Sequence, residues 1–156
     1  MATTPEELAL ELSRASFEAQ RQTEIKLRER ATAVLSAASL VVPVASVAVS
    51  RGSHWAALPL GLAAIAYIVC AAQCCKTLFP KGFATGIAGS EFLEVARSSD
   101  ADLQQMQASA AAYIDEQHTQ NLPTLESAAE SVQRAIYGLM AEIIMAAVAL
   151  VVTLVA

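Results

Sequence analysis

The chain has 156 residues, of which 55% are hydrophobic and only 5% aromatic, with a net charge of −5 and a mean hydropathy of +0.46. This acidic balance excludes the basic surface that nucleic-acid binding requires, so we expect no nucleic-acid partner. The apolar residues gather in three long blocks, whereas a soluble domain spreads them at helix or strand period around one core. The composition therefore indicates a membrane protein, with a soluble bundle of unusually apolar helices as the alternative.

Residues 1–30 predict a cytoplasmic amphipathic helix. Thr4 can cap it, Pro5 suits the first helical position, and Glu7 completes a capping box. Residues 6–42 contain no Gly or Pro, so the helix is expected to continue into the first apolar block. Its predicted apolar stripe consists of Leu8, Leu12, Ala15 and Ala19. The stripe either packs on a partner or on the polar part of the chain, or belongs to a solvated extension.

Residues 31–79 predict a transmembrane hairpin. The segments 31–50 and 52–75 contain 20 and 24 residues without a charge. About 20 helical residues cross the hydrocarbon core of a bilayer, which is about 30 Å thick. We therefore place the first span at 31–50 and the second at 55–75. Pro43 lies in the middle of the first span, where it removes a backbone hydrogen bond, and it is the candidate hinge.

Three cysteines, Cys70, Cys74 and Cys75, gather at the end of the second span. A structural zinc site needs four ligands, and His118 is the only further candidate expected on that side of the membrane. We therefore expect no metal and no cofactor. Palmitoylation beside the membrane is an alternative to the simpler interpretation, small apolar residues in a reducing compartment.

Residues 80–133 predict a cytoplasmic helical segment. A short helix is expected at 90–97, followed by a longer one that Ser99 caps. The sequence Asn121-Leu-Pro123 is expected to break or kink the longer helix, so that the last helix starts near Pro123. The segment would then be a helical hairpin continuous with the final span. No run of residues shows strand alternation, and the predicted fold class is an all-α membrane protein.

Residues 134–156 predict a third transmembrane helix. The 22 residues from Ala135 to Ala156 include one charge, Glu142. This carboxylate lies about 10 Å into the span at about 1.5 Å per residue. A charge there costs roughly 2.5–3.5 kcal/mol on insertion scales and usually faces a bundle interior or water. Glu142 is therefore the candidate residue of a pore or helix interface, unless the span starts later and leaves it at the headgroups.

Basic residues that flank the spans predict the orientation of the chain. Those before the first span are Arg21, Lys26, Arg28 and Arg30. Only Arg51 lies between the first two spans, and Lys76 and Lys81 follow the second. We therefore expect a multi-pass protein of the cell membrane with its N-terminus and residues 80–133 in the cytoplasm. The loop 51–54 and the C-terminus are expected outside.

No catalytic constellation is visible, and we expect that the protein is not an enzyme. Residues 82–133 carry eight acids and a single base. A bound phosphate would need cations or helix N-termini. The candidate cations are Lys76, Lys81, Arg97 and Arg134.

Local motifs, together with the order of the predicted segments, carry a resemblance to a known family. Leu78-Phe79-Pro80-Lys81, followed by Phe83-Ala84-Thr85-Gly86-Ile87-Ala88, is similar to a Pro-basic exit from the second span and an aromatic–Gly–Ile-Ala segment. Glu29-Arg30-Ala31 loosely matches an acid-x-Lys-Ala entry to the first span, with Arg in place of Lys. In these motifs and in its architecture the chain resembles the small membrane effectors of bacterial Pycsar anti-phage systems. The two-span SLATT effectors share the hairpin but explain the closing span less well.

The resemblance implies a function that composition does not show. In such systems a cyclase makes a cyclic pyrimidine nucleotide on infection, the effector impairs the inner membrane, and infection is aborted. The implied partners are the lipid bilayer, further copies of the chain in a homo-oligomer, and the cyclic nucleotide. The alternatives are a small structural or assembly membrane protein and a phage holin.

Overall fold

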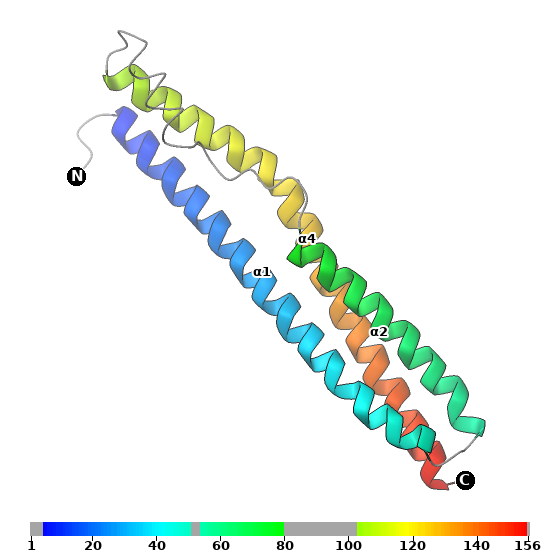
Figure 1. Cartoon of the computed structure of the whole chain (residues 1–156). Helices are drawn as coiled ribbons and strands as arrows, with labels where there is room; N and C mark the ends of the chain where they lie inside the picture. Colours follow the sequence, from blue (N-terminus) through cyan, green and yellow to red (C-terminus); the bar gives the residue numbers. More distant parts are fainter. Residues whose placement is uncertain (1–4, 51–53, 80–102, 156) are drawn as a thin grey trace. The chain divides into compact units, whose positions relative to one another are not determined.

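The structure is a computed structural model that describes residues 5–50, 54–79 and 103–155. Within these ranges, the side chains of 5–7, 44–50, 54 and 103 are left undescribed. The elements are α1 (Pro5–Ser50), the 3-10 turn η1 (His54–Ala56), α2 (Ala57–Leu78) and α4 (Leu103–Val155), which Figure 1 shows coloured along the sequence. Because every regular element in these ranges is helical, the all-α class is confirmed.

The helix α1 runs without interruption for 46 residues and includes Pro43. This confirms the prediction of one continuous helix from residue 6 to residue 42. Pro59 falls in the first turn of α2, where its missing N–H has no helical partner to lose.

Of the break or kink predicted at 121–123, the break is wrong, because α4 continues through Pro123 for 53 residues, and a kink there stays a prediction. Residues 103–155 are therefore a single helix, and the first part of the expected hairpin lies outside the described residues. Asn121 and Leu125 on either side of the proline are both buried, so packing on both sides favours a continuous helix. Pro123 itself is exposed, and the packing of its neighbours offsets the backbone hydrogen bond that proline removes. The short helix predicted at 90–97 lies outside the described residues.

The chain divides into two compact units. Unit 1 comprises residues 1–25 and 81–126, and unit 2 comprises 26–80 and 127–156.

In unit 1 the first part of α1 packs on the first part of α4. The packed side of α1 includes the partly buried Leu10 and Phe17 and the buried Gln20. The predicted stripe faces elsewhere, since Leu8 and Leu12 are 51% and 62% exposed. Alanine and leucine recur on several faces of this helix, so their spacing alone does not distinguish the packed face from a neighbouring one.

Unit 2 consists of the second part of α1, η1, α2 and the second part of α4. Its buried apolar side chains are mostly alanine and cysteine, among them Ala38, Ala63, Cys70, Ala135 and Ala149. The buried and half-buried positions of α4 alternate in steps of three and four residues, which is a heptad spacing. In unit 2 this seam consists of Ala128, Val132, Ala135, Leu139, Glu142, Ala146 and Ala149.

Two helices in the described part of the chain are long and apolar enough to cross a membrane, not three. They are α2 and the apolar part of α4, and only 22% of each apolar window is buried. The span predicted at 31–50 belongs to α1 and does not meet the criterion among the residues searched. Its last seven side chains are undescribed, so this span and the orientation of the chain stay predictions.

Candidate functional site

Glu142 lies on the packed seam of α4 inside unit 2. Its side chain is only 2% exposed, which makes it the largest of the fully buried side chains among the described residues. The residues one turn away along the seam, Leu139 and Ala146, are apolar. The heptad spacing of α4 therefore turns a carboxylate toward the neighbouring helices rather than away from them.

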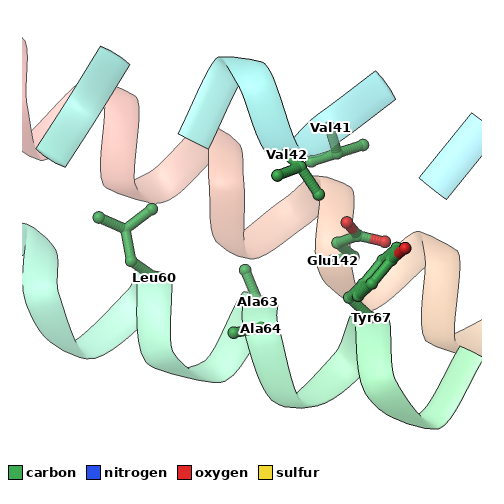
Figure 2. Close-up of a pocket in the computed structure, with 7 residues that line it drawn as sticks. All are labelled: Val41, Val42, Leu60, Ala63, Ala64, Tyr67 and Glu142. Atoms are coloured by element: carbon green, nitrogen blue, oxygen red, sulfur yellow. The ribbon is translucent and has the colours of Figure 1, made fainter. Parts of the chain in front are cut away.

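A pocket of about 250 Å³ opens beside this carboxylate. Its described lining consists of Val41, Val42, Leu60, Ala63, Ala64, Tyr67 and Glu142. The lining comes from α1, α2 and α4, all within unit 2. In Figure 2 the carboxylate points into the space between the two valines of α1 and the ring of Tyr67 on α2. Of these residues, only Glu142 and Tyr67 carry polar side-chain atoms.

The carboxylate is incompletely satisfied. The Oε2 atom of Glu142 is buried and has no hydrogen-bond partner in the structure. None of the residues that line the pocket is basic, so no ion pair forms from the described lining. An unpaired polar atom of this kind is destabilising by about 1–3 kcal/mol, and by more when it is charged. Such a group in a native fold points to a ligand or to a functional state in which it is satisfied.

Close contact between α2 and α4 holds the walls of the pocket in place. A Cβ atom added to Gly138 would lie 3.2 Å from Cys70 Cβ and 3.4 Å from Ala66 O. The glycine therefore lets the two helices approach one turn before Glu142. Gly61 on α2 does not serve this purpose, because nothing lies within 4 Å of its Cβ position.

A polar contact joins the same helices nearer the end of α2. Thr77 is 2% exposed, and its Oγ1 donates to Gln73 O at 3.3 Å and lies 3.4 Å from Ala128 O. Thr77 lies beside Ala128, and Cys70 lies beside Gly138. Because the residue numbers rise along one helix as they fall along the other, α2 runs antiparallel to this part of α4. Cys70 and Cys74 are fully buried along the contact, whereas Cys75 is exposed. Their burial agrees with the interpretation of small packing residues.

The structure describes only two of the four candidate cations, Lys76 and Arg134. Lys76 is exposed at the end of α2, and the Arg134 guanidinium pairs with Glu130 at 3.0 Å on the surface of α4. Lys81 and Arg97 lie outside the described residues. Searched over the described residues, no group of three or more His, Cys, Asp or Glu side chains could hold a metal ion. The hinge assigned to Pro43 stays a prediction, since the helix is continuous there.

Unit 1 contains a buried polar contact that sequence reasoning missed. Gln20 is 5% exposed, and its Nε2 donates to His118 O at 2.8 Å. Asn121, on the same side of α4, is fully buried. The signal that could have revealed this contact is the heptad spacing, which places His118 and Asn121 on the seam with Ala111 and Leu125.

No family model, curated protein or solved structure matches this chain. The Pycsar and SLATT resemblances therefore rest on the motifs and the order of parts alone.

Proposed function

We propose that unit 2 is a membrane-embedded bundle with spans at 31–50, 55–75 and 134–156. The observation that carries this proposal is an inverted distribution of side-chain sizes. Small residues fill the interior of unit 2, while large apolar residues lie on its outside. The most exposed of them include Leu40, Leu58, Ile65, Ile68, Val151 and Leu154, each at least 59% exposed. Water disfavours such a surface, whereas lipid tails solvate it and small residues let membrane helices approach closely.

A soluble bundle accounts poorly for the same surface. The core helix of a soluble protein is mostly buried, but only 22% of each apolar window is buried here. Trp55 at the start of the second predicted span is 80% exposed, which suits an indole at the membrane interface. The flanking basic residues favour a cytoplasmic N-terminus and an external loop at 51–54.

Cysteine labelling of intact cells tests the spans and their orientation. In a background without Cys70, Cys74 and Cys75, we expect Ser53→Cys to react with a membrane-impermeant maleimide. Ser109→Cys should react only after the cells are opened. Labelling of both sites in intact cells would refute the orientation, and recovery of the chain in the soluble fraction would refute membrane insertion.

Within this membrane setting, the chain acts as an effector that impairs the inner membrane and aborts phage infection, triggered by a cyclic pyrimidine nucleotide. The local motifs and the order of parts support this function. The buried carboxylate of Glu142 supports it independently, because a charge inside a span is expensive and marks functional positions. Self-association through the exposed apolar faces would build the conducting or disrupting assembly.

Reconstituted vesicles loaded with a self-quenching dye provide the test. Cyclic CMP or cyclic UMP should release the dye from vesicles that contain the full chain, whereas cyclic AMP should not. Glu142→Gln should reduce the release, and Glu130→Gln, an exposed control on the same helix, should leave it unchanged. If the pyrimidine nucleotides neither bind nor change leakage, the effector function is wrong.

The alternatives predict other outcomes of the same experiment. A holin would permeabilise vesicles without any nucleotide, and a structural or assembly protein would leave them sealed under all conditions. Gene neighbourhood separates them further, since a cyclase gene beside this one favours the effector and an endolysin gene favours the holin.

A further inference from the structure

We propose that the pocket beside Glu142 binds a small amphipathic organic cation, an ammonium group attached to a compact apolar body. This inference does not depend on the cyclic-nucleotide trigger. Three features carry the proposal: the unpaired carboxylate, the apolar walls and the aromatic ring.

The carboxylate supplies the charge that selects the ligand. Glu142 lines the pocket and is only 2% exposed, and its buried Oε2 atom has no hydrogen-bond partner. An ammonium group would donate a charge-assisted hydrogen bond to this oxygen and neutralise it at the same time. A neutral donor such as a hydroxyl would form a weaker hydrogen bond without the charge, and an anionic ligand would add a repulsive charge.

The rest of the lining selects the body of the ligand. Val41, Val42, Leu60 and the two alanines present only carbon atoms to the pocket. Tyr67 adds a ring whose face can attract a cation. The volume of about 250 Å³ equals that of roughly eight water molecules at about 30 Å³ each, enough for one compact alicyclic group.

A metal ion suits this pocket poorly. Magnesium and calcium take about six to eight oxygen ligands. The described lining offers side-chain oxygens from Glu142 and Tyr67 alone. Because the described lining has few oxygen ligands and is mostly apolar, it favours an organic cation over a metal ion.

Binding of 1-adamantylammonium to the full chain in lipid nanodiscs tests the proposal, with 1-adamantanol as the neutral probe of the same shape. Saturation-transfer NMR measures binding. Dicyclohexylcarbodiimide modifies carboxyl groups in apolar sites. Protection of Glu142 from this reagent, measured from the peptide mass, shows whether the probe binds beside Glu142. We expect the ammonium to bind and protect, with about tenfold weaker binding of the alcohol because it lacks the charge.

Variants separate the charge from the shape. Glu142→Gln keeps the size of the side chain and should weaken ammonium binding about tenfold or more. Ala64→Leu narrows the pocket from an exposed position and should weaken binding with the carboxylate intact. Glu130 is an exposed carboxylate that pairs with Arg134, and the Glu130→Gln variant should bind the ammonium as tightly as the unmodified chain does.

Three results would overturn the proposal. The first is that the ammonium and the alcohol bind equally well. The second is that the ammonium binds equally well to the unmodified chain and to Glu142→Gln. The third is that the ammonium does not bind at any concentration up to its solubility. Circular dichroism of each variant shows whether the helices are intact. If Glu142→Gln fails to fold, binding by Ala64→Leu equal to that of the unmodified chain overturns the pocket by itself.

Discussion

At the scale of single residues, Glu142 is almost completely buried and has an oxygen without a hydrogen-bond partner. This combination lowers the stability of the fold, so its presence points to a function. Its isolation follows from its neighbours: the pocket wall beside it is built from valine, leucine, alanine and tyrosine. The residue was identifiable from the sequence because it is the one charge in an apolar block. The identity of its neighbours was not, because three separate segments of the chain supply them.

Replacing Glu142 with methionine should stabilise the protein. Methionine has a similar length and no group that needs a hydrogen bond, so Glu142→Met removes the unsatisfied oxygen. We expect a gain of about 1–3 kcal/mol in the free energy of unfolding, seen as a higher thermal midpoint by circular dichroism in detergent micelles. Glu142→Gln keeps a polar head in the same place and should show no gain. A lower midpoint for Glu142→Met would mean that the carboxylate makes stabilising bonds.

Gly138 should tolerate alanine less well than Gly61 does. Both substitutions gain the same helix propensity, about 1 kcal/mol, so their difference isolates packing. The new Cβ at Gly138 would press on Cβ and Cα of Cys70, which cannot rotate away, whereas Gly61 faces open space. We expect Gly138→Ala to be about 1–3 kcal/mol less stable than Gly61→Ala in the same thermal assay. Equal midpoints would show that α2 shifts without penalty.

At the scale of elements, the sequence predicted helices well and their ends poorly. The long run without Gly or Pro correctly predicted α1 as one helix. The rule that proline ends a helix failed at Pro123, because Asn121 and Leu125 hold both flanks on the packed side of α4. The rule describes the backbone locally, and the packing that overrides it involves residues about a hundred positions away, such as Gln20.

Gln20→Leu should strengthen the pairing of α1 with α4 in unit 1 while loosening its register. The lost hydrogen bond leaves His118 O with its own helical partner, and the unpaired Oε1 of Gln20 disappears. Polar groups at seam positions fix register at the expense of stability. We expect a gain of about 1 kcal/mol in the free energy of unfolding, seen as a higher thermal midpoint by circular dichroism. Thr23→Leu, at an exposed position of the same helix, is the control. A loss of stability for Gln20→Leu alone would show that the amide is a net stabiliser.

At the scale of the whole molecule, composition predicted where apolar residues gather but not which way each one faces. The three apolar blocks were visible in the sequence, and two of them lie in helices that could cross a membrane. The seam of small residues in unit 2 was not visible, because alanine is common on every face of these helices and any register gives small pairs. The same ambiguity put the predicted stripe of α1 on exposed Leu8 and Leu12.

A charge on the outside of unit 2 distinguishes a lipid-facing surface from a water-facing one. Ile144 lies near the middle of the third predicted span and is 55% exposed. On a soluble bundle, Ile144→Arg would be nearly neutral, as most surface substitutions are. In a bilayer it should oppose insertion by about 2.5–3.5 kcal/mol. We expect this variant to lose its carbonate-resistant membrane fraction, while Tyr113→Arg, at a 37% exposed site of α4 in unit 1, keeps it. Retention of Ile144→Arg in the membrane fraction at the level of the control would show that this face does not meet the lipid core.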